Sequence, residues 1–253
     1  MLAIVFDLDN TLYPYAPSDA AGRTSVYKYL QNFTALSAEE FSNLYIECDQ
    51  YTKQMHPKTA AGHNRLLFYH RMCEVLNLPT DVHDLPMYNA YWDAYLNAMR
   101  LFPGAVEFLQ ELKAKQIPLG ICSDLTLHIQ LRKLQKLGLV GVFDKIVTSE
   151  ECGEEKPSAK MFRDILQKLG ASAENSVMIG DNYKRDIVGA LQVGMQAILF
   201  GESREGVLCA QNFHELRTKL FALLQKMSVK KQKKRRGLRF KIQLKISRKS
   251  PAQ

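Results

Sequence analysis

Near its N-terminus the chain reads AIVFDLDNT (residues 3–11), in which a short apolar run ends abruptly in two carboxylates. A run of this length is typical of a strand that is buried on both faces of a parallel sheet. In such sheets, ligands bind beyond the carboxyl ends of the strands. The segment therefore predicts a first strand from Ala3 to Phe6 that delivers Asp7 and Asp9 to the ligand-binding edge.

The same signals recur along the chain and predict the rest of the sheet. Further apolar runs predict strands at residues 119–122, 177–179 and 197–200, with a weaker one at 145–148. Apolar residues at helical spacing predict helices at 105–112, 127–137 and 162–169, and glycines end the last two. In the second helix these residues are Leu127, Leu131, Leu134 and Leu137. Strands that alternate with helices predict an α/β, doubly wound (Rossmann-like) parallel sheet.

Residues 14–101 break this alternation, because they show helical periodicity and no convincing strand. We therefore expect an all-helical cap domain inserted at 14–101 between the two parts of the α/β core, 1–13 and 102–225, with a basic tail at 226–253. A surface helical subdomain without contact to the site is the alternative.

Composition bounds the class of protein. A chain of 253 residues with 46% hydrophobic content can bury one sizeable core and an insertion. Its apolar runs are far shorter than the ~20 residues of a membrane-spanning helix, and no basic leader precedes residue 3. The five cysteines are odd in number and widely spaced, which argues against a disulfide framework and a zinc site. We expect a soluble, cytoplasmic protein.

The net charge of +8 conceals an uneven distribution. Residues 226–249 hold twelve of the 34 basic residues, and the remaining 22 face 26 acidic ones, so residues 1–225 carry about −4. The body is mildly acidic and the tail is strongly basic.

Polar residues that could take part in catalysis or ligand binding follow the predicted strands in a fixed order. Asp7, Asp9 and Thr11 follow the first strand, Ser123 and Asp124 the second, and Asp181 and Asp186 the strand at 177–179; Lys156 precedes the helix at 162–169. Each of these short motifs alone is weak evidence for a site, since a DxD sequence is often part of a solvated loop. Together they predict a single site.

These motifs resemble those of the haloacid dehalogenase (HAD) superfamily, over residues 1 to about 200 and with the cap position of subfamily I. The resemblance implies a magnesium-dependent phosphohydrolase with Asp7 as nucleophile, Asp9 as acid and base, and Lys156 as a charge-neutralising cation. It implies a Mg²⁺ ion held by Asp7, Asp181 and a backbone carbonyl at Asp9, with Asp186 orienting this shell. Leu8, Thr11, Ser123 and Asp124 would bind the phosphoryl group through hydroxyl or backbone N–H groups.

Two features of this pattern narrow the interpretation. An aspartate at position 9 favours phosphate ester chemistry, because the dehalogenases carry a tyrosine-like residue there. Asp124 departs from the asparagine that relatives often carry, and we expect its side chain to point away from the phosphate. A structural carboxylate cluster or an inactive enzyme is the alternative for the whole set.

The cap contains a polar cluster between residues 51 and 70, within which Lys58, His63 and Arg65 are our candidates for recognising the leaving group. Solvated surface positions are the alternative. Trp92 and the tyrosines are interpreted as cap core rather than as a base-stacking surface.

In the tail, Lys230 to Arg236 form a basic cluster, and residues 238–246 alternate between apolar and polar. The alternation predicts a strand with one apolar face. The basic cluster would suit nucleic acid, an anionic lipid surface or, in a eukaryote, a nuclear address. A disordered tail is the simplest alternative.

The sequence therefore predicts a Mg²⁺-dependent phosphatase of a small phosphate monoester, either a nucleoside monophosphate or a sugar phosphate. A phosphomutase with the same carboxylates is the nearest enzymatic alternative. A protein tethered to nucleic acid or to a partner by its tail, with a secondary phosphatase core, is an alternative of another class.

Overall fold

The computed structural model describes residues 1–247, except for the side chains of residue 230 and residues 233–247. A six-stranded parallel sheet with strand order β3-β2-β1-β4-β5-β6 forms its centre. The strands are β1 (Ala3–Phe6), β2 (Leu119–Ser123), β3 (Lys145–Thr148), β4 (Ser176–Gly180), β5 (Gln196–Phe200) and β6 (Cys209–Ala210). The predicted α/β doubly wound sheet is confirmed.

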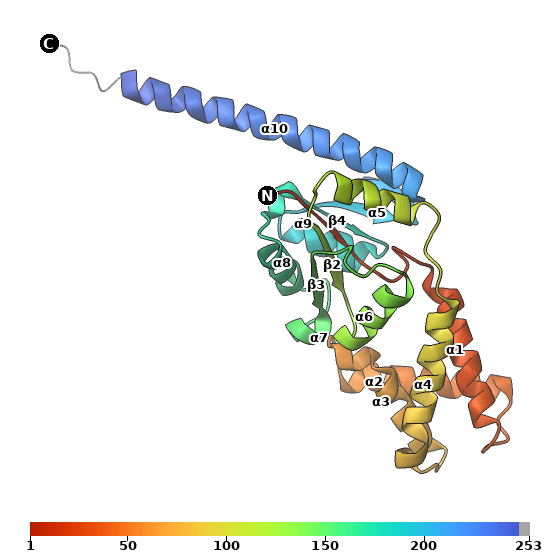
Figure 1. Cartoon of the computed structure of the whole chain (residues 1–253). Coiled ribbons are helices and arrows are strands. Elements are labelled where there is room, and N and C mark those ends of the chain that lie inside the picture. Colours follow the sequence, from red (N-terminus) through yellow and green to blue (C-terminus); the bar gives the residue numbers. More distant parts are fainter. Residues whose placement is uncertain (248–253) are drawn as a thin grey trace.

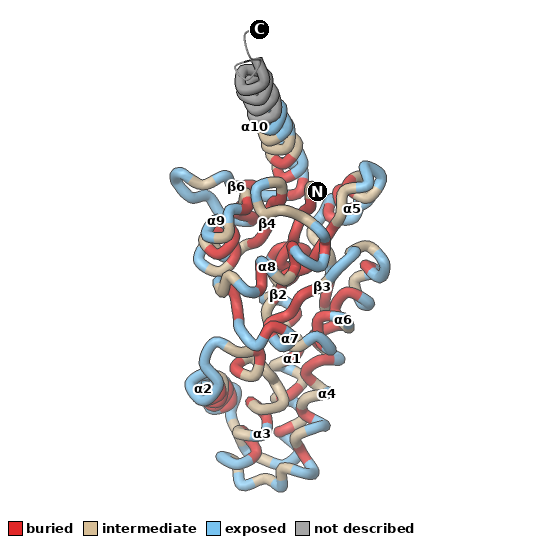
Figure 2. The backbone as a smooth tube through the Cα atoms, turned by 90° about the vertical axis from the view of Figure 1, so that its left-hand side faces the viewer, coloured by how far each residue is buried: buried red, intermediate tan, exposed pale blue. Residues whose placement is uncertain are grey.

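Alternating side chains of each strand pack on opposite faces of the sheet. Ile4 and Phe6 face a core that is shared with α5 (Ala105–Ala114), α6 (Leu127–Lys136) and α10 (Phe213–Ser247). Ala3 and Val5 face a second core with α8 (Ala159–Lys168) and α9 (Gly189–Gln192). The sheet is therefore covered on both faces, and buried residues run along its strands (Figure 2).

The remaining short elements lie in the connections between the strands and helices of the α/β body. They are α7 (Ser149–Cys152) after β3, the 3-10 turn η2 (Ala173–Asn175) before β4, and the π-helical turn η3 (Tyr183–Val188) after β4. Helices α6 and α8 both end at a glycine with positive φ, Gly138 at 70° and Gly170 at 60°, as the sequence predicted.

Between β1 and α5 the chain forms α1 (Tyr15–Leu30), α2 (Ala38–Met55), η1 (Ala60–His63), α3 (Arg65–Val75) and α4 (Thr80–Ala98). We call this helical segment, 15–98, the insertion. Helix α2 begins at a capping box, in which Ser37 and Glu40 bond each other's backbone N–H. The insertion lies at one end of the α/β body, and α10 extends from the opposite end (Figure 1).

The strand predicted at residues 238–246 is wrong, because α10 continues as a helix to Ser247. Phe213, Leu216 and Leu220 are buried against the body and anchor the first turns of this helix. Once a helix is nucleated, each further residue costs little, and Lys, Arg, Gln and Leu are good helix formers. The helix also crosses residue 226, where we expected the tail to begin. None of the helices in the described residues is long and apolar enough to span a bilayer.

Candidate active site

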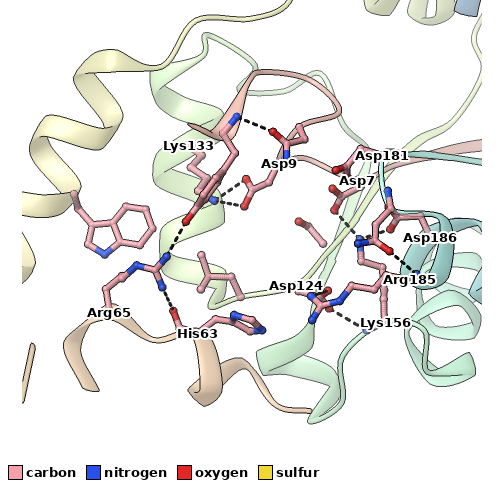
Figure 3. Close-up of a pocket in the computed structure, with 16 residues that line it drawn as sticks. Asp7, Asp9, His63, Arg65, Asp124, Lys133, Lys156, Asp181, Arg185 and Asp186 are labelled. Atoms are coloured by element: carbon pink, nitrogen blue, oxygen red, sulfur yellow. Dashed lines mark hydrogen bonds and ion pairs between the residues drawn. The ribbon is translucent and has the colours of Figure 1, made fainter. Parts of the chain in front are cut away.

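Most of the predicted site residues converge at the carboxyl edge of the sheet, where the strand order reverses. The chain runs from β1 outward to β2 and β3, then returns to β4 on the other side of β1. Asp7 follows β1, and its backbone N–H donates to the carbonyl of Ile179 at the end of β4 (2.9 Å). A cavity of about 230 Å³ opens at this edge and is lined by residues of the sheet loops and of the insertion (Figure 3).

Lys156 is the central cation of the site. Its Nζ lies 2.6 Å from Oδ1 of Asp7 and 2.6 Å from Oδ1 of Asp186, and all three side chains are buried. Burial alone would lower the pKa of Lys156, but Asp186 and Asp7 together raise it well above its ordinary value. Lys156 therefore stays charged, as a neutraliser of negative charge must.

Asp7, Asp181 and Asp186 form a carboxylate cluster in which one oxygen from each residue lies within 4.8 Å of the others. Burial raises the pKa of Asp181 to about 7, and the charges of Asp7 and Asp186 contribute. Burial likewise raises the pKa of Asp186 to about 6, against the effect of Lys156. Three carboxylates face one ammonium here. The excess negative charge and the all-oxygen donor set fit a hard cation such as Mg²⁺.

Gly180 permits the close approach of Asp186 to this cluster. A Cβ atom at position 180 would overlap the Asp186 carboxyl group. Asp186 in turn accepts a hydrogen bond from the backbone N–H of Asn182 (2.9 Å), which fixes the loop that carries Asp181. A side chain at residue 180 would displace a member of the carboxylate cluster.

Asp9 lies beside the cluster and has partners that the sequence did not predict. Its two carboxylate oxygens accept hydrogen bonds from Lys133 Nζ at 2.7 and 2.8 Å, and Oδ1 also accepts one from Tyr13 (2.5 Å). Lys133 is fully buried on α6, whereas Asp9 is partly open to the cavity. The acid and base candidate is thus held from the helix that follows β2.

The predicted phosphate-binding residues occupy different positions relative to the cavity. Ser123 lines it, and its Oγ accepts a hydrogen bond from Gln130 (2.9 Å). Leu8 and Thr11 are buried in the segment that follows β1 and do not line the cavity. The Thr11 hydroxyl has no hydrogen-bond partner among the side chains and backbone that the structure describes.

Asp124 lines the cavity, but both oxygens of its carboxylate are already paired with other groups of the protein. One oxygen accepts a hydrogen bond from the backbone N–H of Lys156 (3.0 Å), and the other pairs with Arg185 (3.1 Å). The negative charge that set Asp124 apart from the family pattern is therefore balanced by Arg185, a cation that the sequence motifs did not indicate.

The insertion contributes the opposite wall of the cavity through His63, Arg65, Tyr15 and Trp92. Arg65 Nη2 donates to the Tyr15 hydroxyl (2.7 Å), and His63 Nε2 lies 2.9 Å from Oε1 of Glu155 on the core side. Two of the three predicted recognition residues thus reach the cavity, and the insertion does contact the site.

Lys58 does not reach the cavity. Its side chain is exposed, and its backbone carbonyl accepts a hydrogen bond from the N–H of Glu155 (3.2 Å). Trp92 is both buried in the insertion and part of the cavity wall.

Sequence reasoning did not single out Lys133 and Gln130, because the helix was predicted from the spacing of its four leucines, of which only Leu134 is buried. Leu127 and Leu131 are exposed, and the buried residues are Ile129, Gln130, Lys133 and Leu134. These four lie on one face of the helix, since they are spaced by three and four residues. Two polar residues on that face would have been the signal.

Comparison with known proteins identifies the family of the chain. A family model described as haloacid dehalogenase-like hydrolase matches residues 1–194. The chain is 40% identical over 205 residues to ribulose-1,5-bisphosphate 5-phosphatase of Halopiger xanaduensis, covering 80% of this chain and 86% of that one. It is 32% identical over 203 residues to glyceraldehyde 3-phosphate phosphatase of Methanothermobacter thermautotrophicus, covering 78% of this chain and 84% of that one.

Solved structures show the same fold. A HAD phosphatase from Thermococcus onnurineus superposes with a TM-score of 0.69 at 23% identity, over 87% of this chain and 98% of that one. The putative HAD-hydrolase YfnB from Bacillus subtilis, whose structure is bound to magnesium, gives 0.69 at 20% identity, over 88% and 98%. The expected enzyme class, a phosphatase of this family, agrees with the relatives. The chain belongs to the haloacid dehalogenase-like hydrolase family.

Proposed function

We propose that this protein is a Mg²⁺-dependent phosphatase that hydrolyses a small phosphorylated sugar through an aspartyl-phosphate intermediate on Asp7. One observation carries the proposal: the buried Asp7 carboxylate contacts Lys156 and belongs to a carboxylate cluster at the switch point of the sheet. A carboxylate nucleophile next to a permanent cation, at the edge where α/β proteins bind ligands, suits an attack on an anionic phosphate.

The reaction would proceed in two displacements. In the first, an Asp7 oxygen forms a bond to phosphorus while the bond to the sugar oxygen breaks, and Asp9 donates a proton to that oxygen. In the second, water attacks the aspartyl phosphate while Asp9 accepts its proton, which releases inorganic phosphate and restores the Asp7 carboxylate. Lys156 contacts Asp7 Oδ1 and would reduce the repulsion between the two anions. Mg²⁺, held by Asp7, Asp181 and Asp186, would supply further positive charge at the phosphoryl oxygens.

The size of the cavity supports a small substrate. Its volume of about 230 Å³ lies below the roughly 300–1,000 Å³ of sites for drug-sized ligands. A phosphorylated sugar of a few carbons fits this better than a nucleotide with its base. The two relatives named above are phosphatases of ribulose 1,5-bisphosphate and of glyceraldehyde 3-phosphate. We infer the same class of substrate here, with the helical insertion acting as a cap whose His63 and Arg65 contact the sugar.

A phosphate-release screen tests this function. Ribulose 1,5-bisphosphate, glyceraldehyde 3-phosphate and nucleoside monophosphates would be compared with and without Mg²⁺, with Asp7→Asn as the inactive control. We expect metal-dependent release from sugar phosphates and weak release from nucleotides. Transfer of phosphate between positions of a sugar without release would identify a phosphomutase instead, and failure of all substrates with Mg²⁺ would refute the proposal.

A further inference from the structure

Lys133 is a buried cation that none of the predicted motifs contains. It lies on α6, its side chain is 1% exposed, and its Nζ donates to both oxygens of Asp9 at 2.7 and 2.8 Å. An ammonium that contacts both oxygens of one carboxylate restrains the rotation of that carboxylate as well as its position. A buried lysine is costly unless it is paired, and the contact with Asp9 offsets that cost.

Three aromatic rings lie near the same ammonium, two from the insertion and one, that of Tyr13, from the segment that follows β1. The Nζ atom lies 5.5 Å from the ring centroid of Tyr95, 5.7 Å from that of Trp92 and 5.9 Å from that of Tyr13. Tyr95 and Trp92 belong to α4 of the insertion. Cations at such distances from ring faces are attracted to them. Lys133 is therefore held from the insertion side as well as from the core.

Tyr13 completes the contacts of Asp9. Its hydroxyl donates to Oδ1 of Asp9 (2.5 Å) and also lies 2.5 Å from the Tyr95 hydroxyl, whereas Oδ2 receives its hydrogen bond from Lys133. Without Lys133, Tyr13 would still hold one oxygen, and the plane of the carboxylate would be free to turn.

We propose that Lys133 is a positioning residue that fixes the Asp9 carboxylate in the orientation required for its acid and base steps. This inference rests on the proposed function, because it assumes that Asp9 transfers the proton. A misplacement of about 1 Å in a reacting group can lower a rate by about 100-fold. The contribution of Lys133 should therefore appear in kcat and should vanish when Asp9 can no longer transfer protons.

The test is a double-mutant cycle with p-nitrophenyl phosphate. Lys133→Met removes the ammonium with little change in shape, and the matched control is Lys136→Met on the exposed side of α6, where Lys136 bonds Asn97 (3.0 Å). We expect Lys133→Met to lower kcat by about 10- to 100-fold with KM within threefold, Lys133→Arg to recover part of the loss, and Lys136→Met to change neither. In an Asp9→Asn background, Lys133→Met should change the residual turnover by less than twofold.

Three outcomes would overturn the inference. Equal losses in both backgrounds would show that Lys133 acts independently of Asp9, and a rise in kcat would show that the pair holds Asp9 out of reaction. A crystal structure of Lys133→Met in which the Asp9 carboxylate keeps its single orientation would do the same, whatever the activity. Absence of turnover by the unmutated protein would refute the proposed function instead, and the crystal structure would still decide on the positioning role.

Discussion

The ammonium nitrogen of Lys156 lies 2.6 Å from Oδ1 of Asp7, and both side chains are buried. Asp7→Asn keeps the shape of the side chain but removes the nucleophile, since an amide cannot form an acyl phosphate. Lys156 would retain Asp186 as its partner, so the fold should persist. We expect turnover to fall by at least ~10³. Phosphate release and circular dichroism on the purified variant check both statements, and activity within tenfold of the unmutated enzyme would exclude Asp7 as the nucleophile.

Asp9→Asn should separate the two displacements. With p-nitrophenyl phosphate the leaving group needs little acid, so Asp7 should still be phosphorylated, but the second step lacks its base. The phosphoenzyme should accumulate and be recovered by rapid acid quench. Asp7→Asn is the control, because it cannot be labelled. If no labelled protein accumulates in Asp9→Asn, Asp9 is not the base of the second step.

The carboxylate cluster predicts a link between pH, Mg²⁺ and stability. Burial, with Asp7 and Asp186, raises the pKa of Asp181 from 3.8 to about 7 in the metal-free protein. The folded state then binds more protons than the unfolded chain, so this group stabilises the fold at low pH and its contribution is lost as the pH rises from about 4 to about 7. In EDTA, the free energy of unfolding should fall across this range.

Mg²⁺ should reverse that loss near neutral pH, because it binds the ionised carboxylates of the folded state. Thermal unfolding with EDTA or Mg²⁺ at about pH 5 and about pH 7.5 measures the effect. Asp181→Asn is the control, in which stability should depend less on pH and less on Mg²⁺. If Mg²⁺ stabilised the protein as much at about pH 5 as at about pH 7.5, the assignment of Asp181 to the metal site would be contradicted.

Most of the sheet could be predicted because fully buried strands leave a simple signal. Ala3–Phe6 and Lys145–Thr148 were predicted with their observed bounds. The prediction differs by one residue at one end for β2 and β5, and by one residue at each end for β4. The differences fall on residues such as Ser176 and Gln196, which join the ladder by backbone pairing and add no apolar side chain. The two-residue strand β6 is too short to produce an apolar run.

The support of the site could not be predicted in the same way. The motif residues directly follow strands, so their place in the sequence predicts their place in the site. The role of Lys133 can be recognised only when the packing of α6 against Asp9 is known. The leucine spacing correctly predicted that α6 is a helix, but it does not identify the buried face, which also carries the polar residues Gln130 and Lys133. In the tail, the order of apolar and polar residues indicated a strand, but a strand requires a partner and the growing helix does not.

Specificity should depend on His63 and not on Lys58. His63 lines the cavity beside Glu155, whereas the Lys58 side chain is exposed and away from it. His63→Gln should raise KM for a sugar phosphate by about tenfold, the loss expected for one hydrogen bond, and change p-nitrophenyl phosphate hydrolysis little. Lys58→Gln is the matched control and should stay within twofold. Steady-state kinetics on both substrates measure this, and equal effects of the two variants would remove the insertion from substrate recognition.

The basic part of α10 should be dispensable for chemistry, since every candidate site residue lies between Asp7 and Asp186. The buried anchors of this helix, Phe213, Leu216 and Leu220, precede residue 225. Truncation after Gln225 should therefore keep kcat on a small substrate within about twofold. The same truncation should also abolish retention on heparin, which mimics an anionic polymer, because residues 226–249 hold twelve cationic side chains.

Retention of the full chain on heparin should weaken steeply with salt, as counterion release requires. Loss of activity or solubility on truncation would show that the fold depends on this segment, and retention that ignores salt would indicate apolar docking instead of electrostatic binding.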